Sequence, residues 1–182
     1  IASDQVPLHV IAMGSTERYG PNRNGDGFRE AMLAKYAHTF ETHAKWFRDH
    51  KNKASDPHFG QVKLAYWNPR MSRVELLIAL NSTKEAAAKY GGRHADKELQ
   101  LIKSGQDLPV SMAIQVPHDV CSACGNVAKT RRSYCKSASE GGKCTLFGCA
   151  TGLTKVSADG HVQHVDNPSG TFCDISLVGR NA

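Results

Sequence analysis

Apolar and polar positions along the chain predict strands towards both ends and helices between them. Apolar residues at spacings of three and four predict a helix over residues 28–47, with a break near His38. A second helical stretch covers residues 83–104 and is interrupted at Gly91 and Gly92. Strands are expected over residues 6–13, 61–67, 73–80, 109–116 and 171–178, and over either 153–157 or 161–165. This order predicts an α+β fold.

Turn-forming residues fill positions 19–27, which we interpret as a loop. Asn22, Asn24 and Asp26 stand at alternate positions before Gly27, as in the first half of an EF-hand calcium loop. The twelfth position is Leu33, where an EF-hand requires a bidentate carboxylate. We therefore expect a turn that leads into the following helix rather than a calcium site.

Length and composition suit one soluble globular domain. The chain has 182 residues, 40% hydrophobic and 22% charged, with a formal net charge of +6. We predict a single domain over residues 1–182 that carries a polar insert at 118–149. Membrane helices need roughly 20 apolar residues in a row, and no apolar run is that long, nor is there a signal-peptide pattern. The start at Ile1 without Met is expected for a processed product or a fragment.

Basic residues are spread along the chain, with the densest group at residues 129–132. Aromatic residues make up only 7% of the chain and lie mostly elsewhere. A nucleic-acid site normally interleaves the two residue types, so this pattern favours a solvated basic surface.

The six cysteines all lie in the second half of the chain and begin with a C-x-x-C pair followed by Gly125. This knuckle presents two thiolates to one tetrahedral ion, and two more thiolates would close a structural zinc site with no open position. The expected ligands are Cys121, Cys124, Cys135 and Cys144. Cys149 or His118 are alternatives for the fourth ligand, and unliganded cysteines or an incidental disulfide are the alternative to zinc. Cys173 falls within a predicted strand and is expected to be a buried apolar residue.

Three residues could form a nucleophilic site. Ser111 lies in an apolar strand, His50 ends the first predicted helix region, and Asp174 is an acidic residue within an apolar strand. A nucleophilic serine needs a base within about 3 Å, and that base needs an orienting partner. Taken singly, each residue has a simpler interpretation that the local pattern favours: a small core residue, a surface histidine and a solvated acid.

Several short motifs together resemble the prohead proteases of tailed bacteriophages, head-maturation proteases related in fold to herpesvirus assemblin. The resemblance covers residues from about 10 to 180, with His50 first, Ser111 61 residues later and an acidic strand near the end. The motifs are G-P-N-R-N-G-D-G-F at 20–28, H-K-N at 50–52, G-x-V at 60–62, N-x-x-M-x-R-V-E-L at 68–76, P-V-S-M at 109–112, C-x-x-C-G-N at 121–126 and F-x-D-I-S-L-V at 172–178.

The resemblance implies Ser111 as nucleophile and His50 as general base. Asp174 fits the acidic position of the phage pattern, whereas assemblins use a second histidine. The other candidates for the third member are His161, His164 and Glu75. Gly179 and Arg180 resemble the glycine-arginine pair that helps to bind the oxyanion in assemblins. Ala113 departs from the glycine that phage relatives tend to have after Ser-Met, which would narrow the site or mark an inactive copy.

The implied protein is a serine endopeptidase built as a small assemblin-like β-barrel with surrounding helices and a zinc-knuckle insert. Its implied substrates are phage scaffold and major capsid proteins, and itself, cut inside the immature head in the host cytoplasm. A homodimer is compatible with the resemblance, and no membrane partner is expected. Two other readings stay open: a silent capsid-associated protein of the same fold, and a zinc-knuckle nucleic-acid binder using Lys129, Arg131 and Arg132.

Overall fold

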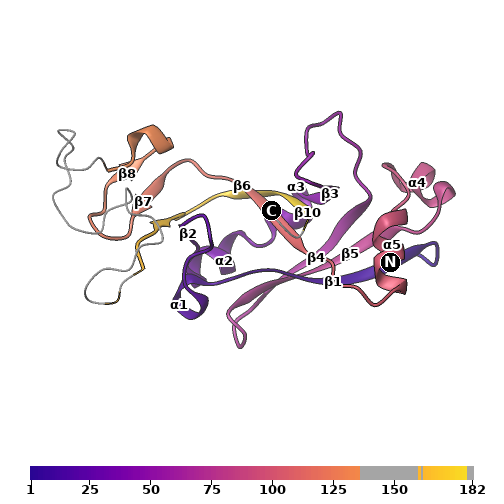
Figure 1. Ribbon diagram of the computed structural model, residues 1–182, viewed down its shortest axis with the longest axis horizontal. Helices are drawn as coiled ribbons and strands as arrows, with labels where there is room; N and C mark the ends of the chain where they lie inside the picture. The colour runs from indigo at the N-terminus through magenta and orange to yellow at the C-terminus, as the bar shows by residue number, and fades with distance from the viewer. Residues whose placement is uncertain (136–159, 161, 180–182) are drawn as a thin grey trace. The chain divides into compact units, whose positions relative to one another are not determined.

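The computed structural model describes residues 1–135, 160 and 162–179, and the chain divides into two compact units (Figure 1). The first unit comprises Ile1–Met13, Tyr36–Gln115 and Thr171–Ala182. The second comprises Gly14–Lys35 and Val116–Gly170, and so contains the region of the expected insert. Within the described ranges, no helix is both long and apolar enough to cross a bilayer.

A curled, half-barrel sheet of six strands forms the centre of the first unit. Its strand order is β1-β5-β4-β3-β10-β6. Strand β10 pairs in parallel with β3 and antiparallel with β6, so a late segment of the chain lies between two earlier ones. The strands are β1 (Gln5–Gly14), β3 (Lys45–Arg48), β4 (Gly60–Asn68), β5 (Arg73–Asn81), β6 (Val110–Gln115) and β10 (Thr171–Leu177). Together with its few helices, the chain has the predicted α+β character.

The core of this unit joins the sheet to the short helix α3 (Thr39–His43). The rings of Phe40 and Phe172 stack with centroids 4.3 Å apart, and both side chains are fully buried. The hydroxyl of Thr39 accepts a hydrogen bond from the Phe172 backbone N–H at 3.0 Å. Burying each large apolar side chain contributes about 1.5–3 kcal/mol. These contacts fix β10 against α3, which matters because β10 carries Asp174.

The helix expected over residues 28–47 is wrong in its last part. The structure has α2 (Glu30–Tyr36), the expected break, α3, and then strand β3. Trp46 and Phe47 are both buried although they are consecutive, as in a strand packed on both faces. Pairing of β3 with β4 and β10 therefore overrides the helical spacing of the apolar residues.

The other main elements of the first unit agree with the sequence pattern. The second helical stretch is α4 (Lys84–Tyr90) and α5 (Asp96–Lys103), and the hydroxyl of Thr83 caps α4 by accepting from the Ala86 N–H at 3.0 Å. The expected interruption lies between them. Gly92 there has φ +88°, and a Cβ atom would lie 2.2 Å from the carbonyl oxygen of His58, so only glycine fits.

The second unit contains a small sheet in the order β2-β9-β7-β8. The Asn22 side-chain oxygen accepts hydrogen bonds from the N–H groups of Asn24 and Asp26, both at 2.9 Å, which confirms the expected turn. Of the two alternative strands, 153–157 lies outside the described residues, and 161–165 meets β9 only at Val165. The elements of this unit are α1 (Thr16–Tyr19), β2 (Asp26–Gly27), most of α2, β7 (Asp119–Cys121), β8 (Val127–Ala128), a 3-10 turn (Arg131–Ser133) and β9 (Val165–Asp166).

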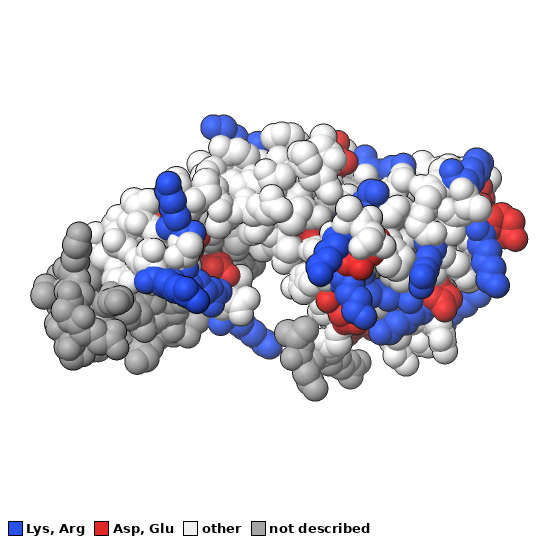
Figure 2. Space-filling view, turned by 90° about the horizontal axis from the view of Figure 1, so that it is seen from above, with Lys and Arg blue, Asp and Glu red and all other residues white. Residues whose placement is uncertain are grey.

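Charged side chains are mixed on the surface. On the face shown in Figure 2, Lys and Arg side chains (blue) recur across the described surface, and Asp and Glu side chains (red) stand beside many of them. This arrangement agrees with the dispersed basic charge of the sequence.

Candidate active site and metal centre

The strand register brings three polar residues to one face of the sheet. Ser176 of β10 lies opposite Ser111 of β6, and Asp174 lies opposite Ala113. Residues two apart on a strand point to the same face, and directly paired residues share a face. Asp174 and Ser111 therefore point to the same side of adjacent strands.

A β-bulge in β10 sets this register. Phe172 pairs with Ile114 and Asp174 with Ala113, which leaves Cys173 as an extra residue. Because one extra residue reverses the facing of everything after it, the bulge turns Asp174 to the face of Ser111. Cys173 is only partly buried, contrary to the buried position expected. Its thiol lies 3.5 Å from the carbonyl oxygen of Ala113, and burial raises the pKa of that thiol.

His50 reaches the same face from a tight turn after β3. Asp49 and His50 have φ angles of +51° and +54°, and the Lys51 N–H donates to the Arg48 carbonyl at 3.1 Å. Such left-handed conformations cost about 1–3 kcal/mol per non-glycine residue and cluster at functional sites. The Asp49 N–H also donates to the Leu177 carbonyl at 2.9 Å, which ties the turn to the end of β10.

The imidazole of His50 bridges the other two candidate residues. Its Nδ1 lies 2.6 Å from Oδ2 of Asp174, and its Nε2 lies 2.9 Å from Oγ of Ser111. The Asp174 side chain is fully buried, whereas 38% of the His50 side chain is exposed. A hydroxyl, an imidazole and a buried carboxylate are thus hydrogen-bonded in series, an arrangement that is able to activate a serine hydroxyl.

Two further donors hold the carboxylate of Asp174. Asn52 Nδ2 donates to Oδ2 at 3.0 Å, and Ser176 Oγ donates to Oδ1 at 2.7 Å. A buried carboxylate is stable only when hydrogen bonds replace its hydration. Neither donor is evident from the sequence, although Asn52 closes the H-K-N motif and Ser176 follows Asp174 at strand spacing. With His50, they give both carboxylate oxygens of Asp174 a hydrogen-bond donor.

The other candidates for the third member have different partners. Glu75 bonds Arg73, Asn68 and His9, and these bonds, led by that to Arg73, lower the pKa of Glu75 to about 2. His164 belongs to the second unit, where its Nε2 lies 3.2 Å from Oδ1 of Asp166. His161 lies outside the described residues.

The proposed oxyanion residue Arg180 also lies outside the described residues. Ala113 lies two positions beyond Ser111 on β6, so its methyl group is on the same face of the strand as the Ser111 side chain.

Three cysteines of the second unit are positioned to hold a metal ion. The sulfur atoms of Cys121, Cys124 and Cys135 lie within 4.8 Å of one another, and Cys121 and Cys135 are buried. Gly125 has φ +71°, and its N–H donates to the Cys121 carbonyl at 2.9 Å, which closes the expected knuckle. Sulfurs bound at about 2.3 Å to one tetrahedral zinc ion lie about 3.8 Å apart. The sulfurs of Cys124 and Cys135 lie 3.2 Å apart, so these two would have to separate slightly around such an ion.

The fourth expected ligand, Cys144, and its alternative Cys149 lie outside the described residues. His118 is described and is not part of the cluster. The four described cysteines form no disulfide with one another. Tyr134 and Val165 pack against the cysteines, so the cluster forms the centre of a small apolar core.

Comparison with known protein families, curated proteins and solved structures returned no match for this chain. The functional argument therefore rests on the geometry of the Ser111 site and of the cysteine cluster.

Proposed function

We propose that this protein is a serine endopeptidase in which Ser111 is the nucleophile, His50 the general base and Asp174 the orienting carboxylate. One observation carries the proposal: the two ring nitrogens of His50 lie 2.6 Å from Asp174 and 2.9 Å from Ser111. These residues come from three separate strands or turns, 61 and 124 residues from His50 in the chain. Hydrogen bonds that only stabilise the fold would not require a hydroxyl, an imidazole and a carboxylate in this order. They would also not require the histidine side chain to be partly exposed.

The proposed mechanism is acyl transfer. Nε2 of His50 accepts the hydroxyl proton of Ser111 as Oγ attacks a peptide carbonyl carbon, and the carbonyl oxygen becomes an oxyanion. The imidazolium then gives its proton to the departing amine, which leaves an ester on Ser111. Water, deprotonated by His50, attacks this ester and releases the acid. Asp174 keeps the proton-bearing Nδ1 towards itself, so that Nε2 is the basic nitrogen.

The biological role that we propose is head maturation in a tailed bacteriophage, with scaffold and major capsid proteins as substrates. The order of the motifs along the chain supports this role. A curled sheet that carries Ser111 on its edge strand, β6, supports it as well. In this proposal the first unit corresponds to the assemblin-like part of such proteases. The site would then work inside the immature head, as the resemblance implies.

We further propose that the cysteine cluster holds a structural zinc ion, with Cys144 as fourth ligand. All-thiolate sites have no open position, so the ion would cross-link the second unit rather than take part in catalysis. The polar composition of residues 118–149 supports this, because such a segment has few apolar side chains to stabilise it.

Covalent labelling with a fluorophosphonate probe tests the protease proposal. Peptide mapping should find the label on Ser111 of the unmutated protein and no label there after His50→Ala. Ser104→Ala is the matched control, because Ser104 is an exposed serine at the end of α5, and it should leave labelling unchanged. Cleavage of phage scaffold or capsid protein should stop in Ser111→Ala.

Labelling of Ser111 that survives His50→Ala would contradict the proposed relay. If the unmutated protein shows neither label nor cleavage but associates stably with capsid protein, the silent structural reading replaces the protease. The observation that favours this second candidate is that the Ala113 methyl group shares the strand face of Ser111.

A further inference from the structure

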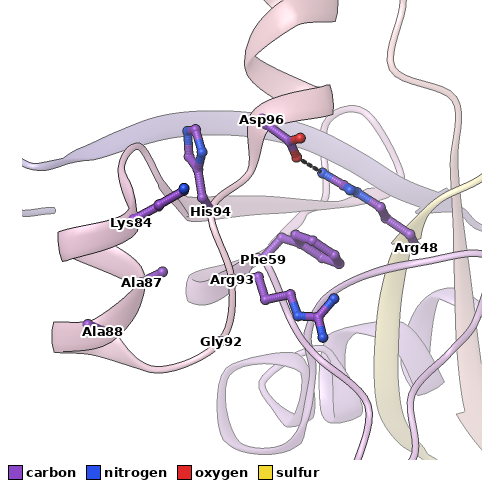
Figure 3. A pocket seen from close by; sticks show the side chains of 9 residues that line it. All are labelled: Arg48, Phe59, Lys84, Ala87, Ala88, Gly92, Arg93, His94 and Asp96. Atoms are coloured by element: carbon purple, nitrogen blue, oxygen red, sulfur yellow. Dashed lines mark hydrogen bonds and ion pairs between the residues drawn. The ribbon is translucent and has the colours of Figure 1, made fainter.

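The turn that carries His50 starts from a fixed end of β3. Arg48, the last residue of that strand, donates to Asp96 at 2.9 Å, as Figure 3 shows, and to the fully buried Glu98. Its guanidinium also lies 3.8 Å from the centre of the Phe59 ring. The backbone that leads into His50 is therefore anchored to α5, the helix that carries both acidic partners of Arg48.

Asn52 holds the other side of this turn. It lies two residues after His50, and its Nδ2 donates to Oδ2 of Asp174 at 3.0 Å. The same oxygen lies 2.6 Å from Nδ1 of His50. Two side chains of one turn therefore meet at one oxygen of a fully buried carboxylate, whereas Ser176 donates to the other oxygen, Oδ1, from within β10.

The turn needs such contacts because its backbone conformation is unfavourable. Asp49 and His50 are both left-handed, and non-glycine residues keep this conformation only where surrounding contacts enforce it. Because 38% of the His50 side chain is exposed, packing encloses the imidazole only in part. Loss of the Asn52 bond would let the turn relax and move Nε2 of His50 away from Oγ of Ser111, which now lies 2.9 Å from it.

We propose that Asn52 is a positioning residue, which fastens the turn of His50 to Asp174 and so keeps the imidazole aligned with the proposed nucleophile. This role rests on the proposed serine endopeptidase and adds to it a residue that acts through Asp174. An amide suits the position, because its NH2 group donates to the carboxylate and carries no charge. An aliphatic side chain there would donate nothing, and a second carboxylate would repel Asp174.

Rates of fluorophosphonate labelling at Ser111 of the full chain test the positioning role. Asn52→Ala should slow labelling about tenfold to a hundredfold, because misplacing a catalytic group by about 1 Å is enough for such a loss. Asn68→Ala is the matched control, because Asn68 Nδ2 also donates to a carboxylate of the first unit, Oε1 of Glu75, at 2.8 Å. It should change the labelling rate less than about twofold. Equal slowing in the two variants would overturn the inference.

Asn52→Asp separates the hydrogen bond from a general effect on folding. The introduced carboxyl group donates only when it carries a proton, and two adjacent carboxylates hold a shared proton more strongly than one carboxylate alone. The labelling rate of Asn52→Asp relative to the unmutated protein should therefore rise about tenfold as the pH falls from about 8 to about 5. The same ratio for Asn52→Ala should not rise. A ratio that behaves alike in both variants would show that the donor has no positioning role.

The tautomer of His50 gives a measurement that does not depend on protease activity. Ring-nitrogen NMR shifts of the neutral imidazole should place the proton on Nδ1 in the unmutated protein and on a mixture of Nδ1 and Nε2 in Asn52→Ala. If the tautomer responds in this way but Ser111 of the unmutated protein takes no label, the protease fails and the positioning role stands.

If neither the tautomer nor the labelling rate responds to Asn52→Ala, the positioning role fails, whether or not Ser111 of the unmutated protein is labelled. Labelling of the unmutated protein then still supports the protease. Well-dispersed NMR spectra of all variants show whether each one is folded.

Discussion

Asp174 is the buried residue at which most hydrogen bonds of the proposed active site meet. Its two carboxylate oxygens accept hydrogen bonds from His50, Asn52 and Ser176. Each donor has a different consequence when it is removed, because one bond orients the base and the other two replace lost hydration.

Asp174→Asn should lower the reactivity of Ser111 by about 10³- to 10⁴-fold, because the neutral amide can turn its NH2 group to Nδ1 of His50 and so favour the wrong tautomer. Rates of probe labelling at Ser111 would measure the loss. A variant that labels at the unmutated rate would show that Asp174 does not orient His50.

Ser176→Ala should lower the free energy of unfolding by about 1–3 kcal/mol, because it removes the donor to a buried carboxylate oxygen. Ser104→Ala, at an exposed position, should change that free energy by less than about 0.5 kcal/mol. Urea unfolding of both variants provides the comparison, and equal values would remove the proposed role of Ser176.

Glu75 should make stability depend on acidic pH. Its folded-state pKa of about 2 lies below the ordinary value of 4.5, so its contribution is fully present above pH 4.5 and is lost as the pH falls towards 2. Glu75→Gln should therefore be less stable than the unmutated protein at neutral pH and equal to it near pH 2. Thermal unfolding followed across this range measures the difference, and a constant gap would contradict the shift.

At the scale of elements, the turn after β3 combines strain with function. Asp49 and His50 both occupy the left-handed region, where glycine is favoured. Asp49→Gly should raise stability by up to about 1 kcal/mol and keep Ser111 labelling, whereas Asp49→Val should lower both. Denaturant unfolding and probe labelling of the two variants check this. Equal stability of the glycine and valine variants would show that the turn stores no strain.

The same element shows what the sequence could and could not predict. Strands β4, β5 and β10 follow from their apolar runs, and the interruption between α4 and α5 follows from two glycines. Strand β3 was missed because Phe40, Ala44 and Phe47 also fit a helix, and only pairing with distant strands decides between the two.

The proposed catalytic residues came from the order of motifs, since spacing alone cannot bring His50 to Ser111. They meet because β10 lies between β3 and β6, and because the bulge at Cys173 turns Asp174 to the correct face. Asn52 and Ser176 were missed for the same reason. Both donate to Asp174, and the orientation of Asp174 depends on the register between β10 and β6, which no local sequence pattern encodes.

At the scale of the whole molecule, the proposed metal site lies in the second unit and includes no residue of the proposed triad. Metal analysis should find about one zinc per chain, and Cys124→Ser should lose it. Cys173→Ser is the matched control, because Cys173 lies in β10 and outside the cluster, and it should keep the metal. Purified unmutated protein without metal would contradict the proposal.

The position of β10 also sets when the proposed enzyme can first act. On the ribosome, His50 and Ser111 emerge well before Asp174. Asp174 belongs to β10, the strand that lies between β3 and β6. A nascent chain that ends before residue 174 contains the nucleophile and the base but lacks the carboxylate that orients them. The contact between His50 and Asp174 closes a loop of 124 residues, and the entropic cost of closing a loop grows with its length. In the proposed enzyme, the order of synthesis would therefore complete the nucleophile and the base before the carboxylate that orients them.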